Sequence, residues 1–208
     1  MGLVMTNRLS REYINTLPII RFDGEVIIVT EEDTAVTILE LLLQEHTIGF
    51  DTESRPSFTK GKAYPISLLQ LSTERTAYLF QLKKTGFPDQ LVALLESEQI
   101  KKIGVGIKND IEKLQELRPF KAGGFVDLSK IASEKGIIQV GLRGLTARYM
   151  EHRLTKTAQK TNWAQSQLTY KQLIYAASDA WICLRIYPHL LADTTNYLQF
   201  IEKEEKKE

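Results

Sequence analysis

The sequence predicts a domain of the α/β class. Short β-branched and apolar runs, which are typical of strands, alternate with longer stretches in which apolar residues recur every three or four positions, which is typical of helices. Two predicted strands, 66–72 and 77–82, are separated only by a short polar turn, so they and the strand at 48–53 are expected to form an antiparallel meander. With 208 residues, 43% of them hydrophobic, the chain is long enough to bury one full core.

Each element is predicted from its own pattern. Strands are expected at 26–29, 48–53, 66–72, 77–82, 103–106 and 123–128. Helices are expected at 11–17, 30–45, 88–97, 107–117 and 142–150, with one more directly after residue 128 and a long one at 169–187. Proline predicts two helix ends, because Pro18 should stop the first helix and Pro188 the last. The polar segments 54–62 and 151–162 are expected to be loops.

Composition limits the classes of function. The net charge of +1 gives no overall signal for nucleic acid, so any basic surface must be local. The single cysteine, Cys183, excludes an intramolecular disulfide and a cysteine zinc site, and its place in an apolar helix pattern predicts a core position. Residues 1–11 lack the apolar region of a signal peptide, and no apolar run is long enough to span a membrane. We therefore expect a cytoplasmic protein without a membrane partner.

The predicted domain boundaries follow the patterned region. The globular domain is expected at 26–193, after an N-terminal arm at 1–25 that the sequence leaves open as ordered or frayed. Residues 194–208 end in alternating charges of both signs and are expected to form a solvated tail.

An apolar run, Ile48-Gly49-Phe50, leads into two carboxylates, Asp51 and Glu53. Side chains alternate along a strand, so both carboxylates should project from the same face. At about 4 Å and an effective dielectric constant near 20, such a pair repels by roughly 4 kcal/mol, and a divalent cation would offset this repulsion. Water at a solvated strand end would also screen the pair, so this motif alone leaves both interpretations open.

Three further residues could complete a site. Asp110 lies near the start of a predicted helix, where the helix dipole favours an acid with or without a ligand. Tyr175 and Asp179 are four residues apart in the last helix, which places them one turn apart on the same face, although a simple buried hydrogen bond would also explain the pair. Asp127 is expected to cap a helix. Gly104-Val105-Gly106 lacks the third glycine and the acidic residue of a dinucleotide-binding loop, which excludes that function.

Together, these motifs resemble the 3′-5′ exonucleases with four acidic residues, in the subclass with a tyrosine in the last motif (DEDDy). The resemblance covers about 48–190 and is strongest to the exonuclease domain of the Werner-syndrome type. The matching segments are Phe50-Asp51-Thr52-Glu53, 66–71, Gly104-Val105-Gly106-Ile107 with Asp110, Asn162-Trp163, and 175–180. The chain departs from these domains at Ser54, where they often carry a tryptophan.

The resemblance implies an RNase-H-like fold, with a mixed five-stranded sheet, its first three strands antiparallel, and helices on both faces. It also implies that Asp51, Glu53, Asp110 and Asp179 hold two divalent ions, Mg2+ or Mn2+, and that Tyr175 orients the attacking water. The sibling subclass has a histidine one position earlier in the last motif, where this chain has Ile174.

The implied activity is hydrolysis of nucleic acid from its 3′ end with release of 5′-mononucleotides. We expect DNA to be favoured, because no helical RNA-binding domain is visible after Leu190. An RNase D-like enzyme that trims RNA has the same five residues, and a non-catalytic nucleic-acid-binding scaffold with this fold is a second alternative.

Aromatic and basic residues could contact a single strand near this centre. The aromatic candidates, which would equally suit the core, are Phe58, Tyr64, Tyr149 and Trp163. The candidates for phosphate contacts are Arg55, Lys60, Lys62, Arg143 and Arg148.

Overall fold

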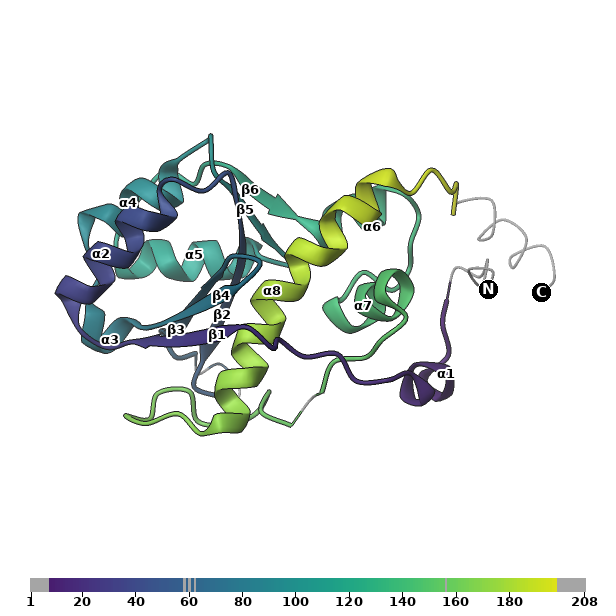
Figure 1. The fold of residues 1–208 in the computed structure, drawn as a ribbon, viewed down its shortest axis with the longest axis horizontal. Coiled ribbons are helices and arrows are strands. Elements are labelled where there is room, and N and C mark those ends of the chain that lie inside the picture. The colour runs from purple at the N-terminus through teal and green to yellow at the C-terminus, as the bar shows by residue number, and fades with distance from the viewer. Residues whose placement is uncertain (1–7, 58, 60, 62, 156, 198–208) are drawn as a thin grey trace.

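A six-stranded sheet separates two layers of helices in the computed structural model (Figure 1). The structure describes residues 8–57, 59, 61, 63–155 and 157–197. The strands are β1 (Glu25–Val29), β2 (Thr47–Ser54), β3 (Ile66–Ser72), β4 (Thr76–Gln81), β5 (Lys101–Gly104) and β6 (Phe125–Asp127), in the spatial order β1-β4-β3-β2-β5-β6. The pairs β2–β3 and β3–β4 are antiparallel, as the meander predicts, and the other three pairs are parallel.

The mixed sheet agrees with the predicted fold class and contains all six strands predicted from the sequence patterns, one more than the five that the family resemblance implies. The short strand β6 pairs in parallel with β5 through Lys102–Phe125, Ile103–Val126 and Gly104–Asp127. Strands β2 to β6 account for the five implied strands, since β2, β3 and β4 are the antiparallel three, and β1 adds the sixth by pairing in parallel with β4 at the opposite edge.

Helices cover both faces of the sheet (Figure 1). They are α1 (Arg11–Thr16), α2 (Glu32–Leu42), α3 (Leu82–Thr85), α4 (Asp89–Glu96), α5 (Lys108–Leu117), α6 (Leu128–Glu134), α7 (Leu142–Met150) and α8 (Tyr170–Ala192). On one face, Leu39 of α2 and Leu94 of α4 pack with Phe50 in one hydrophobic cluster. On the other face, Leu145 of α7 and Ala177 of α8 belong to a second cluster, so the sheet lies between two separate cores.

Strand β2 shows the alternation that the sequence predicts. Ile48 and Phe50 are fully buried in the core beneath α2 and α4. Gly49 faces α8 instead, and a Cβ atom there would lie 2.1 Å from the backbone oxygen of Ala180 and 2.4 Å from Ser72 Oγ. Glycine therefore allows the backbone of α8 to touch β2 directly, and this contact lies next to Asp51 on the strand and Asp179 on the helix.

The last helix is longer than predicted. It begins at a capping box in which the Thr169 and Gln172 side chains each bond the backbone of the other. The prediction that it ends at Pro188 is wrong, because the helix continues to Ala192. Proline removes one hydrogen bond from the helix, but Leu190 in the following turn is completely buried, and this packing holds the last turn in place.

Other boundaries also differ from the prediction, most clearly that of the strand expected at 103–106, which lies at Lys101–Gly104. The strand predicted to reach Leu82 ends at Gln81, and the four-residue helix α3, which the sequence did not predict, follows at once. Helix α2 covers Glu32–Leu42 rather than 30–45, and its N-cap, Glu31, makes no side-chain hydrogen bond. By contrast, Asp127 caps α6 as predicted, since its side chain accepts a hydrogen bond from Ser129 N.

The described part of the N-terminal arm is docked against the domain. The Leu9 backbone exchanges two hydrogen bonds with the Gln139 side chain, Leu9 N to Oε1 at 2.7 Å and Nε2 to Leu9 O at 2.9 Å. Farther along, the backbone of Arg153 pairs with Pro18 and Ile20. The arm thus passes α7 on its way to β1 (Figure 1). No helix in the described ranges is long and apolar enough to cross a membrane.

Substitution of Gly49 tests the contact between α8 and β2. We expect Gly49→Ala to lower the free energy of unfolding by about 3 kcal/mol or more, because the added methyl group would overlap backbone atoms that cannot rotate away. Gly141→Ala is the matched control, because its Cβ would meet nothing within 4 Å. Urea unfolding measures both. Equal stability of the two variants would show that the helix does not press on the strand at this point.

Candidate active site

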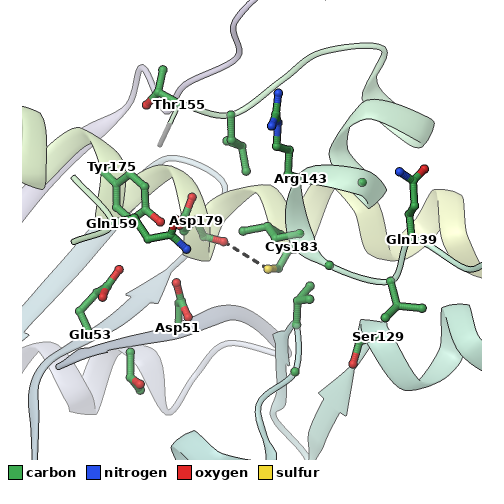
Figure 2. Close-up of a pocket in the computed structure, with 18 of the residues that line it drawn as sticks. Asp51, Glu53, Ser129, Gln139, Arg143, Thr155, Gln159, Tyr175, Asp179 and Cys183 are labelled. Atoms are coloured by element: carbon green, nitrogen blue, oxygen red, sulfur yellow. Dashed lines mark hydrogen bonds between the residues drawn. The ribbon is translucent and has the colours of Figure 1, made fainter. Parts of the chain in front are cut away.

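A pocket of about 730 Å³ opens where β2 meets α8 (Figure 2). Its wall contains Asp51, Glu53, Tyr175 and Asp179, four of the five residues that the sequence predicts for the site. A pocket of this size is in the usual range for sites that enclose a small molecule or part of a larger one.

Local structure explains how these side chains meet. Asp51 and Glu53 lie two residues apart on β2, so both project toward α8. The pairing of β2 with β3 shifts register between Glu53 and Ser54, an irregularity that ends the regular ladder beside the pocket. Tyr175 and Asp179 lie one turn apart on α8, and Figure 2 shows both directed toward the two strand carboxylates.

Asp110 lies beside this pocket rather than in its wall. It is the third residue of α5, and its carboxylate accepts a hydrogen bond from Thr52 Oγ1 at 2.5 Å. Thr52 does line the pocket, and the charge of Asp110 also acts on Asp51 and Glu53, so Asp110 borders the pocket next to Thr52. Within the described ranges, no three Asp, Glu, His or Cys side chains are arranged closely enough to hold one metal ion. The structure thus brings three carboxylates into the wall of one pocket and places the fourth at its border, hydrogen-bonded to Thr52.

Burial raises the pKa of all four carboxylates, and neighbouring carboxylates add to this effect at Asp51 and Glu53. Burial, followed by the charges of Asp179 and Asp110, raises the pKa of Asp51 well above its usual range. Burial and the charge of Asp51 raise the pKa of Glu53 to about 9. The pKa values of Asp179 and Asp110 are also raised, in both cases mainly by burial. The pocket therefore disfavours the negative charges that its residues would carry in water.

Tyr175 is held as a neutral hydrogen-bond donor. Burial, followed by the nearby charges of Asp179 and Glu53, raises the pKa of its hydroxyl far above the usual value. Its ring packs against the indole of Trp163 at a centroid distance of 5.9 Å. Trp163 is 1% exposed, which identifies it as a core residue that supports Tyr175 rather than as a stacking surface for bases.

The other residues predicted to contact a nucleic-acid strand lie in different parts of the structure. The Tyr149 hydroxyl donates to Asp193 Oδ2 at 2.8 Å, and the buried Arg148 guanidinium lies over the ring of Tyr197, so neither lines the pocket. The Arg55 guanidinium lies 5.0 Å from the ring centroid of Tyr64, beside a separate apolar pocket. Of these candidates that the structure describes, Arg143 alone lines the pocket of the carboxylates. Phe58, Lys60 and Lys62 fall outside the described residues.

Several polar residues of the pocket were not predicted. They are Arg11, Ser129, Gln139, Thr155 and Gln159, from the arm, α6 and the loops. No sequence signal marks them, because each reaches the pocket only through tertiary packing. Cys183, predicted as a core residue, also touches the pocket, and its Sγ donates to the backbone oxygen of Asp179 at 3.2 Å (Figure 2).

The donor set suits a hard divalent cation. The carboxylates supply only oxygen atoms, which Mg2+ and Mn2+ prefer, and no thiolate or imidazole competes among the predicted ligands. The raised pKa values are a second sign of fit, because positive charge in the pocket would relieve the same repulsion that protons relieve here.

Comparison with known proteins decides the family. A family model described as a 3′-5′ exonuclease matches residues 26–194, which is most of the chain. This chain belongs to the 3′-5′ exonuclease family. Exonucleases of this family act on nucleic acids, and those with four acidic residues generally depend on divalent metal ions. The predicted family is therefore confirmed.

Two relatives and one solved structure illustrate the match. The chain is 34% identical over 205 residues to the mouse bifunctional 3′-5′ exonuclease/ATP-dependent helicase WRN, covering 92% of this chain and 14% of the mouse protein. It is 30% identical over 196 residues to an Arabidopsis thaliana 3′-5′ exonuclease, covering 86% of this chain and 68% of that protein. Escherichia coli RNase D superimposes with a TM-score of 0.73 and 24% identity, covering 80% of this chain and 44% of that one, which confirms the RNase-H-like fold.

The exonuclease should lose stability as pH rises when no metal is present. Because the pKa of Glu53 is raised from 4.5 to about 9, the folded protein binds more protons than the unfolded chain between these values, so stability falls as pH rises across this window. We expect the melting temperature in EDTA to fall less for Glu53→Gln than for the wild type between about pH 5 and about pH 8. Parallel curves for the two proteins would contradict the electrostatic account.

Proposed function

We propose that this chain is a two-metal-ion 3′-5′ exonuclease that removes 5′-mononucleotides from the 3′ end of nucleic acid. The observation that carries the proposal is the pocket between β2 and α8, where Asp51, Glu53, Asp179 and Tyr175 meet in a chain of the 3′-5′ exonuclease family. Four acidic residues from three separate elements are a costly arrangement for a purely structural role.

Asp51, Glu53 and Asp179, with Asp110 at the border of the pocket, would hold the two ions, Mg2+ or Mn2+. When bound, such ions stabilise the charge on the entering and leaving oxygens at phosphorus and lower the pKa of a bound water. The Thr52 hydroxyl holds the Asp110 carboxylate in place before any ligand arrives, which reduces the reorganisation that binding requires.

Tyr175 positions the nucleophile. Its hydroxyl is neutral at physiological pH and lies beside Asp179, so it can orient a water by a hydrogen bond but cannot remove the proton of that water. Water attacks the terminal phosphorus and the bond from phosphorus to the 3′-oxygen breaks. The shortened strand gains the proton at its 3′-hydroxyl, and the released nucleotide keeps the phosphate at its 5′ position.

The preferred nucleic acid is part of the proposal. DNA is favoured by the higher sequence identity to the mouse exonuclease/helicase, whereas the RNase D structure, which is that of an exoribonuclease, supports the RNA-trimming alternative. Cleavage of one DNA strand and one RNA strand of the same sequence, each labelled at the 5′ end, distinguishes them. Release of single nucleotides from neither strand in Mg2+ or Mn2+ would support the non-catalytic scaffold instead.

Removing a single carboxylate should abolish activity without unfolding the protein. We expect Asp51→Asn and Asp179→Asn each to lower nucleotide release by a factor on the order of a thousand, equivalent to about 4 kcal/mol of barrier. Asp33→Asn, on the exposed start of α2 across the sheet, is the matched control. In the wild type, Mn2+ should raise the melting temperature, and this rise should shrink in both pocket variants. Full nuclease activity in both would place the centre elsewhere.

Tyr175→Phe separates positioning from metal binding. We expect turnover to fall by about 100-fold, because the water loses its orienting hydrogen bond while the carboxylates stay in place. The rise in melting temperature with Mn2+ should match that of the wild type. Unchanged turnover would remove the tyrosine from the mechanism, and a lost response to Mn2+ would assign it a structural role.

A further inference from the structure

The pocket of the carboxylates has a second, positively charged end. Two arginines line it, Arg143 in the first turn of α7 and Arg11 in the first turn of α1. Figure 2 shows Arg143 beyond Asp179 and Cys183 as seen from Asp51. Neither arginine forms an ion pair with a carboxylate in the part of the chain that the structure describes, although Glu12 follows Arg11 on the arm.

The N-terminal arm holds Arg143 in place. An Nη2 hydrogen of Arg143 is donated to Asn15 Oδ1 of α1, while its Nε is buried and makes no hydrogen bond with any described residue. The two bonds between Leu9 and Gln139 fix the arm to the segment just before α7. Because Nε is buried, an anion would reach this guanidinium through its Nη1 and remaining Nη2 hydrogens, and a guanidinium already oriented by a neutral partner can bind it with little further ordering.

The start of α7 adds to the same charge. Its N-cap is Gly141, which supplies no side-chain cap, and its first turn contains no acidic residue. Gly141, Leu142 and Arg143 all line the pocket, so the positive end of the helix dipole lies at the wall that carries the arginine. The same pocket also exposes apolar side chains, among them Val105 and Leu154, which suit a sugar and base between two charged ends.

From this arrangement, we propose that Arg143, supported by Arg11 and the docked N-terminal arm, forms a subsite for a backbone phosphate upstream of the phosphate that is cleaved. The inference rests on the proposed exonuclease function. Phosphates recur along a strand at every nucleotide, so a substrate whose last phosphate is at the carboxylates presents further phosphates toward the rest of the pocket. The arm then becomes part of the substrate-binding wall, and the enzyme distinguishes a strand from a single phosphodiester.

Two substrates test the subsite. One is a 5′-labelled single strand of the nucleic acid that the wild type cleaves, and the other is the p-nitrophenyl ester of thymidine 5′-monophosphate, which has one phosphate and no upstream one. We expect Arg143→Ala to lower kcat/KM for the strand by about 10- to 100-fold, mainly through KM, and to leave hydrolysis of the ester unchanged. Arg143→Lys should recover part of the loss, and Asn15→Ala and Arg11→Ala should show smaller losses of the same kind.

Binding gives an independent readout. In an Asp179→Asn background, which prevents cleavage, Arg143→Ala should make the dependence of log affinity for the strand on log salt less steep by about 0.7, as expected for one lost phosphate contact on a single strand. The control is Arg75→Ala, since Arg75 is exposed in the turn between β3 and β4. This variant should alter neither the hydrolysis of the two substrates nor the salt dependence of strand binding.

The outcomes separate the two proposals. Equal losses on strand and ester, or no loss on either, would overturn the phosphate subsite, whereas a wild type that hydrolyses neither substrate would overturn the exonuclease function itself. Thermal unfolding of each variant checks the fold. If Arg143→Ala does not fold, the strand and the ester are compared in Arg143→Lys and Asn15→Ala instead. Both variants keep a positive charge on α7 and alter only how it is presented to the phosphate.

Discussion

The direct contact between α8 and β2 is the constraint on which the rest of this structure depends. Because Gly49 has no side chain, the backbone of α8 at Ala180 approaches β2 more closely than any other residue would allow. Asp179 comes just before Ala180 on the helix, and Asp51 comes two residues after Gly49 on the strand. The same contact that closes the core therefore brings acidic groups from distant parts of the chain into one partly buried pocket.

This arrangement opposes the stability of the fold. Burial raises the pKa of every predicted carboxylate, and repulsion between them adds to this at Asp51 and Glu53, so the packing of α8 against the sheet must outweigh an unfavourable electrostatic term. That packing is extensive, since the middle of α8, including Ala176, Ala177 and Ile182, is completely buried. Burial raises the pKa of the Tyr175 hydroxyl as well. Packed on Trp163 beside the carboxylates, the tyrosine keeps its proton, so it can form hydrogen bonds but cannot act as a base.

Much of the site could be predicted from the sequence because its geometry is local. The period of two on β2 places Asp51 and Glu53 on one face, and the period of the helix places Tyr175 with Asp179, whatever the rest of the chain does. The features that the sequence did not predict are set by long-range packing. The position of Asp110 beside Thr52, the continuation of α8 past Pro188 and the docking of the arm all depend on partners far away in the sequence. The domain boundaries and the cytoplasmic location remain predictions.

The central claim is that the pocket between β2 and α8 binds divalent cations through its carboxylates. The most direct measurement is anomalous X-ray diffraction from crystals of the protein soaked in Mn2+. The account predicts two manganese peaks bounded by Asp51, Glu53 and Asp179, with Asp110 near one of them. Well-ordered crystals with no manganese peak in this pocket, or with manganese bound only at other carboxylates, would contradict it.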